Sequence, residues 1–321
     1  MSKWRIAALA LAVLAVALSL LNASWLAPAP RGKLLLVAHR GLAQRVREGA
    51  GDESCAATRI RPPDHLFIEN TVFSMQNAVR FGADAIELEV QPTSDGRMVV
   101  FADPTLDCRT NGKGPVRAHT LAELKALDIG HGYTPDGGKT YPLRGRGIGG
   151  MPTVEEVLQK LPTIRLIFNF RSEDPRDADA LVAAFGRASV KIDDKYGFYG
   201  HPGVTARLKR LVPSAWIPFE PKMSACLDDY LKFGWSGFLP ASCRDTNVAI
   251  PLHSQWTIWG WPNRFLSRMA GAHTKVLIVA DYEGGTFTRI ERPDQLGDVP
   301  RDFRGYLFIE DFHTVGRALQ L

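Results

Sequence analysis

Short apolar runs alternate with amphipathic segments along most of this chain. KLLLVA at residues 33–38 and RLIFNF at residues 165–170 have the length and composition of buried strands. Between them, apolar residues recur at helical spacing from Val72 to Val79, and Gly82 ends the predicted helix. We predict further helices beginning at 120 and spanning 153–161, 175–188, 203–211, 222–233 and 262–271, and further strands at 85–90, 97–101, 196–199, 216–219, 237–239, 276–278 and 306–308.

This alternation of strand and helix, with short connections, favours a parallel α/β fold. The number of elements suits a TIM-type (β/α)8 barrel with eight strands. We therefore expect one barrel domain at residues 33–321, preceded by a hydrophobic segment at residues 1–32. No linker divides the barrel region, and the hydrophobic content of 45% is enough for a large core.

The N-terminal segment has the character of a membrane or export sequence. Two basic residues precede an apolar run from Ile6 to Leu21, and Trp25 and Leu26 extend it to the roughly 20 residues that cross a bilayer. It is either an uncleaved anchor or a signal peptide cut near the small residues that follow. We favour the anchor, because no small-x-small cleavage site immediately follows Leu21. Residues 33–321 are then anchored facing the periplasm or exterior, or secreted if the segment is cleaved.

Composition adds two constraints. The formal net charge of +5 is spread along the chain, which argues against nucleic acid as a partner. Thiols of exported proteins tend to pair, and four cysteines allow three pairings that the sequence alone does not distinguish. We expect Cys55 to pair with Cys108, in loops that flank the strand at 85–90, and Cys226 with Cys243. No C-x-x-C spacing occurs, so we do not expect a zinc site.

The predicted strand at 85–90, AIELEV, carries two acids at alternate positions. Alternation places Glu87 and Glu89 on one face and the apolar residues on the other. Two buried carboxylates repel each other unless a cation lies between them. Oxygen ligands without thiolates or a histidine cluster suit one divalent cation, Ca²⁺ or Mg²⁺. The alternative interpretation is a strand with one solvated acidic face.

Six short motifs occur in a specific order. They are His39-Arg40-Gly41, Glu69-Asn70-Thr71, Gly82-Ala83-Asp84 before the acidic strand, Thr93-Ser94-Asp95-Gly96, Val99-Val100-Phe101 and Leu106-Asp107-Cys108-Arg109-Thr110. In this order they closely resemble the glycerophosphodiester phosphodiesterase family. The resemblance also takes in residues 120–128 and, more loosely, the chain to its end. It implies a TIM-type barrel that uses one divalent metal to hydrolyse a phosphodiester to a phosphomonoester and an alcohol.

The resemblance also implies roles for individual residues. His39 corresponds to an acid/base residue and Arg40 to a phosphate contact. Glu87 and Glu89 correspond to metal ligands, although the family commonly has aspartate at the second position.

Where the family usually carries Glu-x-Lys on its fourth strand, this chain has Asn169 and Arg171. Asn169 still offers an oxygen as the third metal ligand, but with one negative charge fewer, so the ion is held less tightly. Arg171 keeps a cation whose planar fork suits phosphate oxygens.

The most serious departure from the family is Ala102, which stands where the family carries a second catalytic histidine. Loss of one acid/base group costs about 10² to 10⁴ in rate. A substitute could come from His65, His119 or His131, which all lie in predicted loops. Each is otherwise an ordinary loop histidine.

Three functions therefore stay open. The first is an exported, membrane-tethered hydrolase of glycerophosphodiesters or phospholipid-derived head groups. The second is a catalytically impaired barrel that binds a phosphodiester or envelope lipid without cleaving it. The third assigns no ligand, and Arg40 and Arg171 only neutralise Glu87 and Glu89.

The tryptophans at 256, 259 and 261 leave two interpretations open. They either form a wall of the substrate cleft or pack the core.

Overall fold

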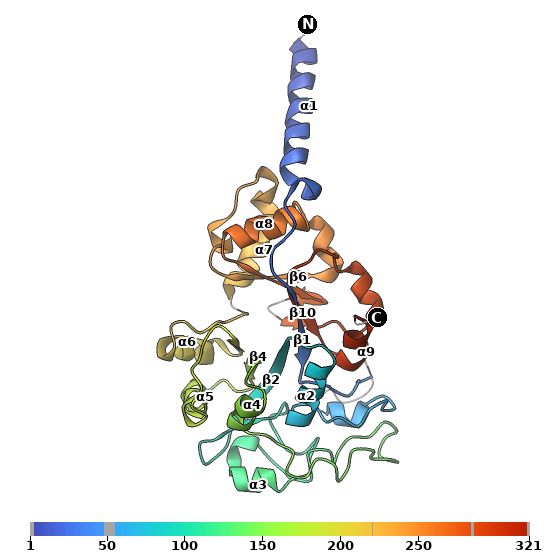
Figure 1. Ribbon diagram of the computed structural model, residues 1–321, viewed down its shortest axis with the longest axis vertical. Coiled ribbons are helices and arrows are strands. Elements are labelled where there is room, and N and C mark those ends of the chain that lie inside the picture. Colours follow the sequence, from blue (N-terminus) through green and yellow to red (C-terminus); the bar gives the residue numbers. More distant parts are fainter. Residues whose placement is uncertain (1–2, 48–54, 220, 284–285, 320–321) are drawn as a thin grey trace. The chain divides into compact units, whose positions relative to one another are not determined.

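The computed structural model describes residues 3–47, 55–219, 221–283 and 286–319 of the chain. The chain forms two compact units (Figure 1). Unit 1 comprises residues 1–35 and 219–308, and unit 2 comprises residues 36–218 and 309–321. Each unit contains parallel strands followed by helices, which confirms the predicted α/β class.

Unit 2 is built on parallel strands in the order β5-β4-β2-β1. Their bounds are β1 (Leu34–His39), β2 (Ala85–Pro92), β4 (Arg165–Phe170) and β5 (Tyr196–Tyr199). The strand predicted at 97–101 is β3 (Met98–Val100), which pairs antiparallel with β2. A tight turn joins β2 to β3, and parallel strands need a crossover of a dozen or more residues. β3 is therefore a hairpin partner of the acidic strand.

The helices of unit 2 begin at residues that cap them. Thr71 accepts from the amide of Ser74 at the start of α2 (Val72–Arg80). Thr120 and Thr153 form capping boxes with Glu123 and Glu156 at the starts of α3 (Leu121–Lys125) and α4 (Val154–Lys160). The other helices are α5 (Arg176–Arg187), α6 (Pro202–Leu211) and α9 (Phe312–Ala318).

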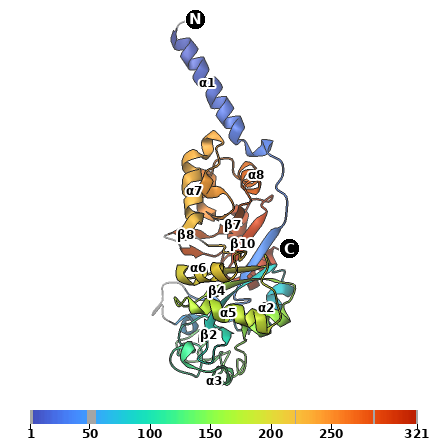
Figure 2. The ribbon, with the colours of Figure 1, turned by 90° about the vertical axis from the view of Figure 1, so that its left-hand side faces the viewer.

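Unit 1 holds parallel strands in the order β10-β7-β6. These are β6 (Asn247–Pro251), β7 (Lys275–Val279) and β10 (Gly305–Ile309), and the last residue of β10 enters unit 2. The helices are α1 (Lys3–Asn22), α7 (Pro221–Phe233) and α8 (Asn263–Gly271), and β8 (Asp281–Glu283) pairs with β9 (Thr286–Thr288). Figure 2 shows α7 and α8 beside the end of α1.

Two predicted strands were wrong. Residues 237–239 form no strand, because Gly237 adopts a left-handed conformation with φ of 80° and Ser236 accepts the amide of Phe238 in a turn. β6 begins at Asn247 instead. The segment 216–219 is reduced to a single bridge between Trp216 and Gly197. The expected disulfides, Cys55–Cys108 and Cys226–Cys243, are both confirmed.

Candidate active site

The turn after β1 positions the first two candidate residues. His39 ends β1 in register with Glu87 of β2. Arg40 and Gly41 follow with positive φ angles of 58° and 77°. A Cβ atom on Gly41 would lie 2.8 Å from the backbone nitrogen of Met75, so the turn requires glycine. The Arg40 amide donates to the Glu87 carbonyl (2.7 Å), which holds the turn against the acidic strand.

The buried imidazole of His39 lies among three carboxylates. Its Nδ1 atom is 2.7 Å from Oε2 of Glu310, the residue after β10. Its Nε2 atom is 3.4 Å from Oε1 of Glu89 and 3.8 Å from Oε1 of Glu87. A carboxylate accepts but does not donate, so Glu310 favours the proton of His39 on Nδ1. Nε2 is then the nitrogen that faces the two acids of β2.

Arg40 neutralises Glu89. Its Nε (2.9 Å) and Nη2 (2.7 Å) contact Oε1 of Glu89, and Asn70 Nδ2 donates to Oε2 (2.8 Å). Burial raises the pKa of the Glu89 carboxyl, but the charge of Arg40 and the contacts with His39 and Asn70 outweigh burial. They hold that pKa well below its ordinary value of 4.5. Glu87 is fully buried as well, and the hydroxyl of Tyr199, the last residue of β5, donates to its Oε1.

Asn169 and Arg171 enter the region from β4. Asn169 lies in register between Glu89 of β2 and Tyr199 of β5, so its side chain projects from the same face of the sheet as Glu89. Arg171 follows β4, and its Nε donates to the carbonyl of Ala102 (3.1 Å). Within the described part of the chain, Arg171 makes no ion pair with the acids of β2. The structure thus brings Asn169 to the acidic pair and leaves Arg171 beside position 102.

Ala102 borders a second buried network. Arg109 donates to Glu69, to Asp103 (2.9 Å) and to the hydroxyl of Tyr133 (2.5 Å). Burial raises the pKa of Glu69, but the charge of Arg109 outweighs burial and leaves that pKa lowered. Ala102, Glu69, Arg109 and Tyr133 are among the residues that line a cavity of about 10 Å³, which is the size of one water molecule. Residue 102 therefore lies in a buried and closely packed environment, among charged groups.

The three histidines considered as substitutes make other contacts. The ring of His65 lies 4.6 Å from that of His313, measured between centroids. Nε2 of His119 is 2.9 Å from the carbonyl of Lys113, and His131 faces an aspartate three residues earlier in the chain. Across the described ranges, no hydrogen bond or ion pair joins any of the three to His39 or to the acids of β2.

Asp64, His65 and His313 form a separate group whose ligand atoms lie within 4.8 Å of one another. The amide of Phe67 donates to Nδ1 of His65 (3.3 Å), so the proton of the neutral ring is on Nε2. Nε2 is also the atom that faces Asp64, at 3.9 Å. A metal-bound histidine normally donates from its other nitrogen. This group therefore has the wrong tautomer for a metal site.

The acidic pair fits a hard divalent cation better. Glu87, Glu89 and Asn169 offer oxygen ligands, which Ca²⁺ and Mg²⁺ prefer. Each carboxylate oxygen has two lone pairs, so the bonds from Arg40 leave capacity on Glu89. Asn70 Oδ1 is a further buried oxygen near Glu89, and it has no hydrogen-bond partner among the described residues. The donor set is thus suited to an oxygen-preferring ion.

Two residues of this site, Glu310 and Tyr199, were not predicted from the sequence. Both lie at or just after the carboxyl end of a predicted strand. Polar residues at the carboxyl ends of barrel strands commonly carry function, and that rule would have selected both. It would not have shown which acid or base each one contacts.

Residues 39–198 match the model of the "Glycerophosphoryl diester phosphodiesterase family". "Glycerophosphodiester phosphodiesterase" of Caldanaerobacter subterraneus is 30% identical over 180 residues, which cover 56% of this chain and 53% of the relative. The protein of the same name from Bacillus subtilis is 36% identical over 131 residues, which cover 40% of this chain and 36% of the relative. The chain thus matches about half, or less, of the length of these relatives.

Solved structures match over more of the chain. The glycerophosphoryl diester phosphodiesterase domain of an uncharacterized Mycobacterium tuberculosis protein has a TM-score of 0.61 at 19% identity, covering 90% of this chain and 98% of that one. An Oleispira antarctica phosphodiesterase, solved in complex with the product sn-glycerol-3-phosphate, has a TM-score of 0.57 at 18% identity, covering 93% and 100%. These likenesses confirm the predicted TIM-type fold.

Proposed function

This chain belongs to the glycerophosphodiester phosphodiesterase family, and from that premise we propose that it is a metal-dependent hydrolase of glycerophosphodiesters or phospholipid-derived head groups. The products are a phosphomonoester and an alcohol. The observation that carries the proposal is the arrangement around His39, whose Nδ1 is paired with Glu310 while Nε2 faces Glu87 and Glu89. This arrangement combines an oriented base with an acidic pair that suits a cation.

His39 performs the proton transfers. It takes the proton of the attacking hydroxyl as the new P–O bond forms, and it returns that proton to the leaving oxygen as the old P–O bond breaks. Glu310 keeps the imidazole oriented and stabilises its protonated form. Because Ala102 replaces the second histidine, His39 carries both transfers, and we expect slow turnover.

Arg40 and Arg171 bind the phosphate. The Arg40 side chain is 20% exposed and already donates to Glu89, so it holds the phosphate next to the acidic pair. Arg171 is exposed and is fixed by the carbonyl of Ala102. Two guanidinium groups stabilise the charge that develops on the phosphoryl oxygens.

Glu87, Glu89 and Asn169 hold the divalent cation. When bound, the ion polarises a phosphoryl oxygen and lowers the pKa of the attacking hydroxyl. These residues also keep negative charge next to His39, which favours the protonated imidazole between the two transfers.

A second candidate function is binding without cleavage. It is favoured by Ala102, which is buried and lines a small cavity with Glu69, Arg109 and Tyr133; none of the described residues that line this cavity is a histidine. In that case Arg40 and Arg171 retain a phosphodiester and no bond is broken.

Hydrolysis of glycerophosphocholine with added Ca²⁺ or Mg²⁺ tests the proposal. We expect slow release of a phosphomonoester that chelator and His39→Ala abolish. Ala102→His should raise the rate, whereas Ala102→Asn, a polar side chain of similar reach without acid/base capacity, should not. Absence of turnover with either ion, together with no gain from Ala102→His, would favour the second function.

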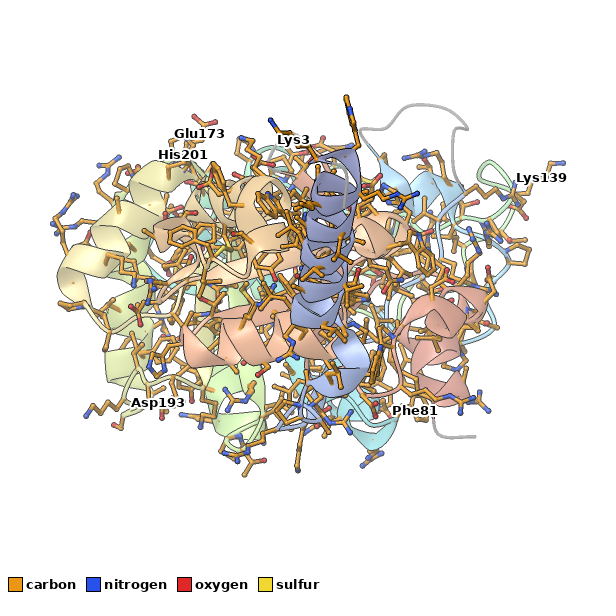
Figure 3. The ribbon with its side chains drawn as sticks, turned by 90° about the horizontal axis from the view of Figure 1, so that it is seen from above. Lys3, Phe81, Lys139, Glu173, Asp193 and His201 are labelled. Atoms are coloured by element: carbon orange, nitrogen blue, oxygen red, sulfur yellow. A yellow bond between two sulfur atoms is a disulfide. The ribbon has the colours of Figure 1, made fainter. Side chains whose placement is uncertain are left out.

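We also propose that the protein is exported and that α1 is its membrane segment. α1 has 20 residues with a mean hydropathy of 2.2, and none of its residues is buried. Figure 3 shows α1 with Lys3 in its first turn. Basic residues are typical of the cytoplasmic end of a membrane helix. With Lys3 and Arg5 at that end, the chain after α1 lies on the opposite side of the membrane.

A further inference from the structure

The C-terminal end of α1 is fastened to unit 1 by a specific set of hydrogen bonds. Arg268 of α8 donates to the carbonyl of Leu21 (3.1 Å) and to Oδ1 of Asn22 (3.1 Å). Asn22 Nδ2 donates to the carbonyl of Trp235 (2.7 Å), and the amide of Asn263 donates to Oγ of Ser24 (2.8 Å). A cation at the C-terminus of a helix also complements the helix dipole.

This attachment extends into unit 1. Arg268 also donates to the hydroxyl of Tyr230 (2.7 Å), which in turn donates to the carbonyl of Trp259 (2.9 Å). Gly237 packs closely against the same end of α1, because a Cβ atom there would lie 3.0 Å from the side chain of Leu21. The end of α1 thus occupies a fitted place. A signal peptide that is cleaved off does not need such specific contacts with the mature protein.

Exposed aromatic side chains surround that place. They form a group, here called the aromatic collar, of Trp25, Trp235, Trp256, Trp259, Phe233 and Phe238. Trp256 and Trp25 are 72% and 76% exposed. Among the described residues of unit 1 outside α1, every exposed large apolar side chain belongs to the collar, except Leu26, which is next to Trp25.

Several contacts place the collar next to the end of α1. Trp235 supplies the carbonyl that Asn22 binds, and Asn22 lines the same cavity as Trp256. The indole N–H groups of Trp256 and Trp259 donate to the carbonyls of His253 (3.1 Å) and Leu231 (3.0 Å). The two rings are therefore fixed in orientation while their faces stay exposed.

We propose that the aromatic collar sits in the interfacial layer of a phospholipid bilayer, with α1 retained as an uncleaved anchor. Tryptophan and other aromatic rings concentrate at that layer, at the ends of membrane-spanning helices. Unit 1 is then held against the membrane by its own surface as well as by α1. The proposal rests on α1 being a membrane segment and is independent of hydrolysis.

Two measurements on the full chain test it. The intact mass of protein purified from membranes should show an uncleaved N-terminus, and a mature chain lacking α1 would overturn the proposal. For the collar, Trp4→Phe and Trp25→Phe remove the fluorescence of the anchor and its flank. This leaves five of the seven tryptophans, of which three, Trp235, Trp256 and Trp259, belong to the collar.

In this background we expect emission in nanodiscs of brominated phosphatidylcholine to fall by about a third or more relative to the unbrominated lipid, because brominated chains quench indoles at the interface. Replacing the three collar tryptophans with phenylalanine should remove this loss, since Trp216 and Trp261 are buried or half-buried. Equal emission in both lipids, with α1 intact and embedded, would overturn the proposal. An inactive protein would still give a decisive result, because neither readout uses turnover.

Discussion

The Nδ1 atom of His39 lies 2.7 Å from a carboxylate oxygen of Glu310, a residue 271 positions later in the chain. The side chain of Glu310 is 32% exposed and that of His39 is 4% exposed, so the pair joins a buried base to the solvent side of the site. This contact makes Glu310 a positioning residue for the proposed reaction.

Glu310→Gln should lower kcat about tenfold to a hundredfold, as is typical when a partner that orients a functional histidine is lost. The amide can still accept from Nδ1 but carries no charge. The protonated imidazole is then less stable, so the rising limb of the rate–pH profile should move to lower pH. KM should change little. Glu173→Gln, at an exposed glutamate (Figure 3), is the matched control, and an equal fall in kcat there would contradict the role of Glu310.

Arg40→Gln should reduce the free energy of unfolding by about 3–5 kcal/mol at pH 7, because it leaves the buried charge of Glu89 without its partner. Urea unfolding measures the change. Arg207→Gln removes the solvent-exposed pair with Asp179 and should cost about 1 kcal/mol or less. Similar losses in the two variants would show that the Arg40 pair is no more important to the fold than a surface pair.

The pH dependence of stability should follow from the same pair. The pKa of Glu89 is held well below 4.5 in the folded protein. Its stabilising contribution is therefore complete above the unfolded pKa near 4.5 and is lost as pH falls from there through the lower folded pKa. Unfolding free energies measured between pH 7 and pH 3 should decline below pH 4.5 in the wild type. The decline should be shallower in Arg40→Gln, and an unchanged slope would contradict the assignment.

Asn169→Glu should tighten the binding of Ca²⁺ or Mg²⁺ by about tenfold or more, because it adds a negative charge beside Glu89. Titration calorimetry gives the affinity without any need for turnover. Asn169→Gln has the same length as the glutamate variant but no charge, and it should leave the affinity within a few-fold of the wild type. Equal affinities in the two variants would argue against an ion at this position.

The two disulfides should contribute unequally to the free energy of unfolding. Cys55–Cys108 spans 53 positions and Cys226–Cys243 spans 17. Each disulfide lowers the chain entropy of the unfolded state, and the longer loop lowers it more. The expected stabilisation is about 4 kcal/mol for the first disulfide and about 3 kcal/mol for the second. Paired alanine variants, compared by urea unfolding, should rank in that order. The reverse order would show that contacts around Cys226–Cys243, and not chain entropy, dominate.

The sequence by itself determined the local features of this protein. Helices and strands follow from hydrophobic spacing and caps within a few residues, and so α2, β2, β4 and α5 were predicted to within two residues of their observed bounds. The alternation in β2 placed Glu87 and Glu89 on one face before any contact was known. The strand expected at 237–239 failed for a local reason too, since the left-handed Gly237 breaks the extended chain.

Only the tertiary structure decided which groups meet. Glu310 reaches His39, and Tyr199 reaches Glu87, because parallel strands far apart in the chain bring their carboxyl ends together. Strand register and the direction of each side chain set these contacts, and neither is encoded in the spacing of one segment. The same holds for the aromatic collar, whose tryptophans look like core residues in the sequence. Their exposure next to the end of α1 results from packing among segments more than 200 residues apart.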